Sequence, residues 1–130
     1  MNKRLYVQYM LSAKQIGVSL SFSGLDLSQA NLSNIEFPPK TDFSGCRLGD
    51  TNFSNSSLVD ANFTDCYLLR TNFDGADLSQ ADLTRAILFF ALITNANVKD
   101  TKFGKPSVVN AKFDGTDKWQ ATWQKEQGEA

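Results

Sequence analysis

The residues of this chain that could do chemistry are few, and the first candidates are Cys46 and Cys66. The two thiols lie twenty residues apart, and the sequence contains no His. His is the commonest metal ligand and general base in proteins, and a structural zinc site needs four ligands, usually Cys and His. Two cysteines alone therefore do not predict a metal centre. The remaining possibilities are a disulfide or two reduced thiols.

Acidic and amide side chains recur along the chain and could act as paired carboxylates or bind calcium. Examples are Asp42, Asn62, Asp77 and Asp82. Calcium-binding solenoids use a Gly- and Asp-rich nonapeptide, which this sequence lacks, and Asp or Asn at a turn usually accepts hydrogen bonds from nearby backbone N–H groups. No nucleophile is paired with a base, and the glycines form no phosphate-binding loop. We expect a non-catalytic protein with no cofactor, no metal and no small-molecule substrate.

Length, charge and hydropathy exclude further classes of protein. The chain has 130 residues, enough for one domain, with 13 Lys and Arg against 14 Asp and Glu. It therefore lacks the basic surface typical of proteins that bind nucleic acid directly. The longest apolar run, from Ala86 to Ile93, is far shorter than the roughly 20 residues of a membrane-spanning helix. We expect neither direct nucleic-acid binding nor a membrane protein.

The element that must position all these side chains is a repeat of five residues. A large apolar residue recurs at every fifth position, with a slip of one residue after Phe37, and a small residue usually lies two positions before it. The large positions are Leu27, Leu32, Phe37, Phe43, Leu48, Phe53, Leu58, Phe63, Leu68, Phe73, Leu78, Leu83, Leu88, Ile93, Val98, Phe103, Val108 and Phe113. A period of five fits neither a helix nor a strand. The chain must instead turn a corner at each repeat, and four sides would form a coil of twenty residues that pairs its backbone with the next coil.

The repeat unit also has a familiar sequence. Units such as Ala76-Asp77-Leu78-Ser79-Gln80 and Ala81-Asp82-Leu83-Thr84-Arg85 read A(D/N)LXX, and this pattern resembles the pentapeptide-repeat family over about residues 22–116. The resemblance implies an all-β fold, a right-handed quadrilateral parallel β-helix whose large and small residues point inward. We expect about five coils over residues 22–116, an N-terminal cap at 1–21 and a C-terminal cap and tail at 117–130.

Stacking at twenty-residue intervals predicts how the interior is filled. One side carries Phe43, Phe63, Leu83 and Phe103, and the opposite side carries Phe53, Phe73, Ile93 and Phe113. The other two sides carry Leu and Val; one of them ends at Val108 and the other at Lys118. The slip at Pro38-Pro39 predicts a bulged loop, because proline cannot donate to the backbone ladder. The geometry of the other corners stays open, because glycine holds no fixed position in the repeat.

The same register places Cys46 and Cys66 on adjacent coils of one side. Parallel side chains in register are poorly disposed for the dihedral angle of a disulfide. We therefore expect two reduced thiols, which agrees with a cytoplasmic location.

Both ends of a solenoid expose unpaired backbone and need covers. At the N-terminus we expect a short amphipathic helix from Lys3 to Gln15 that is ended by Gly17. The apolar residues expected to cover the first coil are Leu5, Tyr9, Met10, Leu11, Ala13 and Ile16. At the other end we expect Trp119 and Trp123 to close the interior.

The outward positions are polar along most of the chain, with one exception around Phe89 and Phe90. Adjacent coils extend this exception into one apolar and aromatic surface. Its members are Tyr67, Leu69, Ile87, Phe89, Phe90, Leu92 and Val109, and its expected border is Arg47, Asp50, Arg70 and Asn110. A patch of this size usually marks an interface. It could bind a protein partner, pair with a second copy in a two-fold dimer, or be covered by the chain's own N-terminal helix or C-terminal tail.

Two functions are compatible with these features. The first is a non-catalytic scaffold or protein–protein interaction module that uses the aromatic surface. The second is implied by the resemblance: some pentapeptide-repeat proteins are similar to B-form DNA in shape and charge and bind type II topoisomerases such as DNA gyrase. That mimicry needs dense negative charge, and Lys99, Lys102, Lys105, Lys112 and Lys118 interrupt it here.

Overall fold

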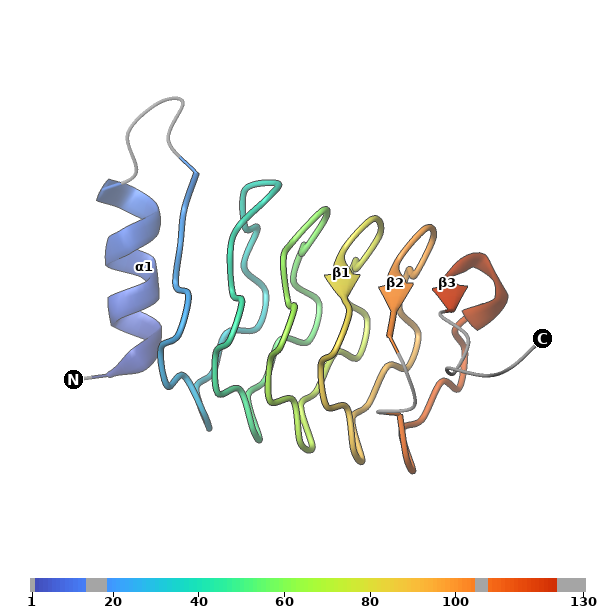
Figure 1. The fold of residues 1–130 in the computed structure, drawn as a ribbon. Helices are drawn as coiled ribbons and strands as arrows, with labels where there is room; N and C mark the ends of the chain where they lie inside the picture. The colour runs from blue at the N-terminus through green and yellow to red at the C-terminus, as the bar shows by residue number, and fades with distance from the viewer. Residues whose placement is uncertain (1, 14–18, 105–107, 124–130) are drawn as a thin grey trace.

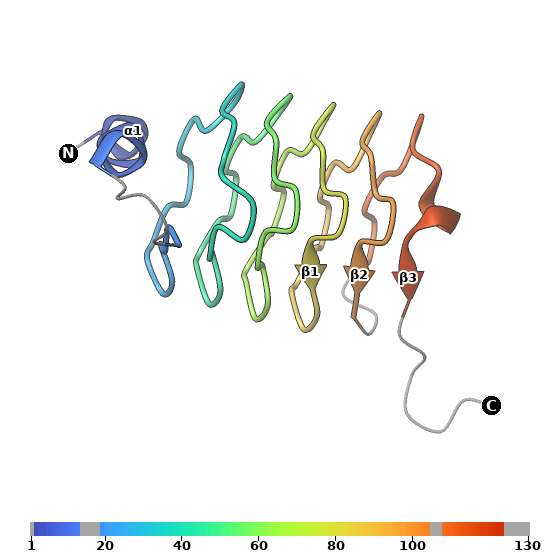
Figure 2. The same cartoon turned by 90° about the horizontal axis from the view of Figure 1, so that it is seen from above.

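The chain winds into a column of stacked coils, as shown by a computed structural model that describes residues 2–13, 19–104 and 108–123 (Figure 1). Helix α1 (Lys3–Ala13) lies at one end, and the short 3-10 helix η1 (Lys118–Gln120) lies at the other. Strands β1 (Asp82–Leu83), β2 (Lys102–Phe103) and β3 (Thr122–Trp123) form a parallel sheet in that order and follow one another in a row along the column (Figure 2). Neither described helix has the length and apolar character needed to cross a bilayer.

Most of the coil-to-coil pairing consists of single parallel bridges in a fixed register. From Asp42 onward the paired residues lie twenty apart, as in Asp42 with Asn62, whereas Ser21 pairs with Asp42 at a spacing of twenty-one. The extra residue falls at the predicted slip, where the Thr41 N–H donates to the Pro38 carbonyl over 3.2 Å. The predicted bulge is therefore a one-residue insertion that a tight turn accommodates. Pro39 occupies the second position of this turn, where the fixed φ of proline fits.

The large side chains fill a single narrow interior, as the repeat predicts. Phe43 stacks on Phe63 with ring centroids 5.0 Å apart, and Phe53 stacks on Phe73 at 5.5 Å. The two stacks meet edge to face across the interior, with 5.5 Å between Phe43 and Phe53. These four rings are fully buried. Each such side chain contributes about 1.5–3 kcal/mol to stability.

The small inward residues have a second role that their size alone does not reveal. Where this position is Thr, Ser or Cys, its side chain usually donates to a carbonyl of the preceding coil, as Thr71 Oγ1 does to the Leu48 oxygen over 2.7 Å. Ser56 and Cys66 make the corresponding bonds to Leu32 and Phe43. Thr41 is the exception among the described residues, because it donates to Pro38 in its own turn. Within the described residues, every buried side-chain nitrogen or oxygen has a hydrogen-bond partner. These polar residues therefore cost little in the dry interior.

The corners of the coils share one conformation. One residue at each described corner, from Gly24 to Gly115, has a positive φ. At most corners the N–H of the next residue donates to the carbonyl three positions earlier, as Thr71 does to Leu68 over 3.2 Å. This combination is the pattern of a type II turn. Asn, Asp and Gly tolerate this left-handed conformation best, which explains why these types recur there although glycine is not fixed at it.

Helix α1 covers the first coil, and its basic side chains donate hydrogen bonds to the backbone of that coil. Arg4 Nη1 donates to the carbonyls of Asn31 and Ser33 over 2.9 Å each, and Lys3 Nζ donates to the Ser28 carbonyl over 2.7 Å. These bonds satisfy backbone oxygens at the exposed end of the β-helix.

The buried face of α1 differs from the predicted one. Val7 is fully buried, and Tyr6, Met10 and Leu11 pack around it against the core. Leu5 and Tyr9 were expected on this face but are 62% and 66% exposed. The helical period of 3.6 places the Val7 group on one side and Leu5 with Tyr9, four residues apart, on another. Gln15, Ile16 and Gly17, which belong to the expected helix and its end, lie outside the described residues.

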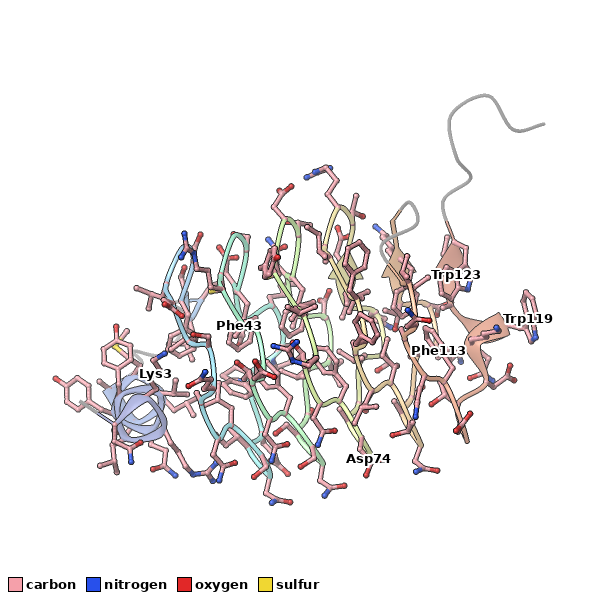
Figure 3. All side chains as sticks on the ribbon, turned by 90° about the horizontal axis from the view of Figure 1, so that it is seen from below. Lys3, Phe43, Asp74, Phe113, Trp119 and Trp123 are labelled. Carbon is pink, nitrogen blue, oxygen red and sulfur yellow. The ribbon has the colours of Figure 1, made fainter. Side chains whose placement is uncertain are left out.

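The C-terminal end is partly covered by one tryptophan, and the second points away from it. Trp123 stacks on Phe103 at 4.5 Å, and its ring N–H donates to the Lys118 carbonyl over 3.0 Å. The expectation for Trp119 is wrong, because this side chain is 81% exposed and projects from the end of the column (Figure 3). Asp117 accepts the Trp119 N–H and starts η1, and this turn directs Trp119 outward. A cavity of about 310 Å³ remains between Phe113, Trp119 and Trp123.

A charge placed in the interior tests this inward assignment. Leu78 is fully buried, so Leu78→Lys would hold an unpaired ammonium in a dry environment at a cost of several kcal/mol. We expect this variant to lose its cooperative thermal transition in circular dichroism. Gln80→Lys is the control, because Gln80 is exposed at a corner whose stacked neighbours are Asp60 and Asp100. It should melt like the wild type, and equal melting temperatures for both variants would refute the assignment.

Candidate functional site

One surface of the β-helix departs most from a polar exterior, and we call it the aromatic patch. It consists of the seven residues expected from the sequence: Tyr67, Leu69, Ile87, Phe89, Phe90, Leu92 and Val109. Backbone pairing brings them together from successive coils. Tyr67 is bridged to Ile87, and Leu92 lies around the corner between Asn72 and Lys112. The corners that carry Leu69, Phe89 and Val109 stack on one another through bonds such as Phe90 N–H to the Val109 oxygen at 3.0 Å. The patch therefore covers one side of the β-helix and the adjoining corner.

Members of the aromatic patch differ in exposure. Tyr67, Phe89, Phe90 and Val109 are 49%, 38%, 52% and 51% exposed, respectively. The other three, Leu69, Ile87 and Leu92, are half-buried beside them. Helix α1 lies over the first coil and does not cover this surface (Figure 1). The other expected cover, the tail at 124–130, lies outside the described residues.

Phe90 has a backbone conformation that its side chain does not favour. Its φ is +61°, at the corner position occupied in the adjacent coils by Arg70 and Asn110. The other described residues with positive φ are Gly, Asn, Asp, Gln, Lys or Arg. The left-handed conformation costs a residue with a Cβ roughly 1–2 kcal/mol, and a half-exposed ring recovers little of this by burial. Folding alone therefore does not account for an aromatic residue at this corner.

Two ladder ion pairs border the aromatic patch. Arg70 Nε lies 2.8 Å from Asp50 Oδ1 and Nη2 lies 3.1 Å from Oδ2, and Arg85 binds Asp65 with the same two distances. In each pair the hydrogen bond from the guanidinium lowers the pKa of the carboxyl group. The Arg85 pair was missed in the sequence. The signal was available, because Asp65 and Arg85 have the same twenty-residue spacing as Asp50 and Arg70.

The recurring Asp and Asn residues serve the turns. Asp42, Asp77 and Asp82 each accept the N–H of the residue two positions later, over 2.8–2.9 Å. The expectation that these side chains satisfy nearby backbone groups is confirmed. In the described part of the chain, no three His, Cys, Asp or Glu side chains are grouped so that they could hold a metal ion.

Cys46 and Cys66 are both buried and unpaired, as expected. Cys46 Sγ donates to the Phe22 carbonyl over 3.0 Å, and Cys66 Sγ donates to the Phe43 carbonyl over 2.8 Å. Burial raises the pKa of Cys46 to about 11, and burial together with the neighbouring Cys46 raises the pKa of Cys66 further. Both groups are therefore held as neutral thiols and are poor nucleophiles.

Comparison with known proteins agrees with this geometry. The family model described as pentapeptide repeats matches residues 40–73 and 66–104, with eight copies of the repeat. No curated protein matches the chain.

Several solved structures have a similar fold. A pentapeptide repeat protein from the thylakoid lumen of Arabidopsis thaliana is 29% identical, with a TM-score of 0.61 over 73% of this chain and 62% of that one. HetL, a pentapeptide repeat protein involved in heterocyst differentiation regulation in the cyanobacterium Nostoc sp. strain PCC 7120, is 23% identical, with a TM-score of 0.65 over 89% and 48% of the two chains. QnrB1, a plasmid-mediated fluoroquinolone resistance protein, is 23% identical, with a TM-score of 0.56 over 72% and 48%. The chain thus spans about half to three fifths of the length of these proteins. At 23% identity the likeness shows the fold alone.

The conformation of Phe90 leads to a prediction about stability. Phe90→Asn replaces an aromatic residue by one that tolerates a positive φ, so we expect the free energy of unfolding in urea to rise by about 1 kcal/mol. Phe89→Asn is the control, because Phe89 is in the same patch but has no positive φ. It should not stabilise the protein. A gain of equal size in both variants, or a loss in Phe90→Asn, would contradict the strain at Phe90.

The raised thiol pKa values predict low reactivity. With a pKa of about 11, about one thousandth of Cys46 is thiolate at pH 8, so neither cysteine should react with Ellman's reagent until the protein is unfolded in urea. Because the pKa is higher in the folded state than in the unfolded state, stability should fall as the pH rises above about 8.5. An exposed thiol in Gln80→Cys provides the positive control. Fast modification of the native wild-type thiols at pH 8 would contradict their burial.

Proposed function

The chain belongs to the pentapeptide-repeat family, and from this premise we propose that it is a non-catalytic interaction module whose aromatic patch binds protein. Its interior and corners serve folding, because the inward residues fill the core and the Asp and Asn side chains bind the turns. Residues selected for binding must then lie among the outward positions. The aromatic patch is the part of the described exterior where several adjacent outward positions become apolar.

One observation carries the proposal: Phe90 is a half-exposed aromatic residue with a φ of +61°. An Asn at this corner would favour folding, and it would also make the surface more polar. Stability is commonly lost at functional positions in this way. Contact with a protein partner would bury Phe90 together with Tyr67, Phe89 and Val109, and aromatic residues of this kind are enriched at the centres of protein interfaces.

The alternative is a DNA-mimicking modulator of a type II topoisomerase such as DNA gyrase, and it has less support. A mimic of DNA needs a continuous line of free negative charge. Asp50 and Asp65 are each paired with an arginine. Asp60 and Asp100 occupy the same corner two coils apart, with the neutral Gln80 between them. Lys99 is next to Asp100, and the whole chain has a formal charge of only −1.

The two unpaired cysteines bear on the compartment. Both are buried and free, which suits a protein kept under reducing conditions. We propose that the protein acts in the cytoplasm.

The proposed function predicts a loss of binding when the aromatic patch is made polar. In affinity capture from native lysate, the wild type should retain proteins that Phe89→Ser/Phe90→Ser does not retain. Static light scattering on the same samples would show whether a second copy is the partner. Leu5→Ser/Tyr9→Ser is a matched control, because it removes two other exposed apolar residues, on helix α1, and should behave like the wild type.

Three outcomes decide between the two functions. Proteins or a dimer lost only in the Phe89/Phe90 variant would support the interaction module. Identical captured proteins and a monomer for all three chains would refute it. Inhibition of gyrase supercoiling by the wild type would favour the mimic, and we expect none at high protein concentration.

A further inference from the structure

We infer that the partner of the aromatic patch is an acidic segment of another protein that also carries large apolar side chains. This inference rests on the proposed function and specifies the chemistry of the partner. It comes from the charges at the border of the aromatic patch, which differ in sign from the charge of the chain as a whole.

The border of the aromatic patch is rich in cations. The exposed charged residues directly beside its members are Arg47, Arg70, Arg85 and Lys112 with Asp50 and Asp65. One position further out lie Asp26, which is bridged to Arg47 and pairs with Lys3, and Asp114, two residues after Lys112. Arg47 is bridged to Tyr67 on the side toward helix α1, and Lys112 is bridged to Leu92 on the side toward η1. The border therefore has an excess of positive charge, although the formal charge of the chain is −1.

The two carboxylates at the border are already occupied. Each accepts two hydrogen bonds from one guanidinium, at 2.8 and 3.1 Å. A guanidinium has five N–H donors, so Arg70 and Arg85 keep donors that can face a partner. The aromatic patch thus offers a partner donors and positive charge, while its own acceptors are used within the β-helix.

Arg47 and Lys112 are the cations best placed for a new ion pair. Neither has a carboxylate within 4 Å among the described residues. They flank the aromatic patch at levels three coils apart, about 14 Å along the axis at the spacing of adjacent strands. Lys112 also lies one side further around the coil than Arg47, so this axial distance is a minimum. A partner segment therefore needs at least about nine or ten residues of a helix, or about four or five residues of an extended chain. A short segment with Asp or Glu at both ends of an apolar cluster would match both cations and the apolar surface between them.

A second copy fits this surface less well. In a two-fold interface the same surface faces itself, so Arg47 and Lys112 of one chain would oppose the same cations of the other. Like charges across an interface cost binding energy. The seven residues of the aromatic patch are also fewer than the roughly 20–30 residues per partner of a stable interface.

The chain's own C-terminal tail lacks the required chemistry. Its sequence, Gln124-Lys125-Glu126-Gln127-Gly128-Glu129-Ala130, contains no large apolar residue. It offers two carboxylate side chains but no large apolar side chain to pack on Phe89 or Phe90.

The test uses a phage-displayed library of random dodecapeptides as the probe, selected on the full-length protein. Selection in parallel on Phe89→Ser/Phe90→Ser identifies the peptides that depend on the aromatic patch. A third selection uses Arg47→Glu/Lys112→Glu, which reverses the two free border cations. The matched control is Lys99→Glu/Lys102→Glu, which changes the net charge equally at exposed residues outside the aromatic patch.

We expect the patch-dependent peptides to combine Asp or Glu with Phe, Leu or Trp. Fluorescence anisotropy should show about tenfold weaker binding when the acidic residues of a selected peptide are changed to Asn and Gln. A similar loss is expected with Arg47→Glu/Lys112→Glu but not with the lysine control. Binding should also weaken as the salt concentration rises.

Other results would overturn the inference in distinguishable ways. Patch-dependent peptides without an excess of acidic residues would refute the acidic partner but leave the proposed function standing. A dimer that dissociates in Phe89→Ser/Phe90→Ser, with no selected peptide, would identify a second copy as the occupant and again spare the proposed function. No patch-dependent peptide together with a monomeric wild type would refute both.

Discussion

Each coil of this β-helix is held by the backbone groups of the coils on either side, and the rest of the structure depends on that register. The Leu68 N–H donates to the Ile87 carbonyl over 2.8 Å, and the Ile87 N–H donates back to the Cys66 carbonyl over 2.9 Å. Because such bonds repeat every twenty residues, every side chain lies above or below its counterpart in the adjacent coils. The phenylalanine stacks, the inward Thr bonds and the surface ion pairs are all consequences of this one alignment. It also explains why the insertion at Pro38 is confined to a turn, since an extra residue within a side would shift all the residues after it to the wrong face.

The same alignment divides the residues into those that serve folding and those that are free to vary. Inward residues are limited by the volume of the interior, and corner residues are limited by a positive φ. The outward residues between them meet neither limit, so a surface can be changed without changing the fold. At Phe90 the two demands conflict, because an outward aromatic residue occupies a corner that favours Asn or Gly. The aromatic patch is therefore recognisable as a departure from the rules that the rest of the chain follows.

The fold could be predicted from the sequence because its main determinant is periodic. The spacing of Phe43, Phe63 and Phe73 alone predicts that these side chains face the interior, and the family resemblance implied the same architecture. The errors concern the direction in which a side chain points at the two ends of the β-helix, which residue spacing does not determine. The fully buried Val7 was overlooked because the face of α1 that packs on the first coil is chosen by tertiary contact. Trp119 was placed inside because it is large and apolar, whereas the turn that begins at Asp117 directs it outward.

The candidate site was predictable as a set of residues but not as a physical surface. Spacing brought the seven members of the aromatic patch together, yet it revealed neither the strain at Phe90 nor the occupied state of Asp50 and Asp65. Those two facts change how the surface can bind. Arg70 and Arg85 are held by carboxylates of the preceding coil, and the backbone holds Phe90 at its corner. Binding of the proposed partner would therefore cost less conformational entropy of this surface than it would on a surface of unrestrained side chains.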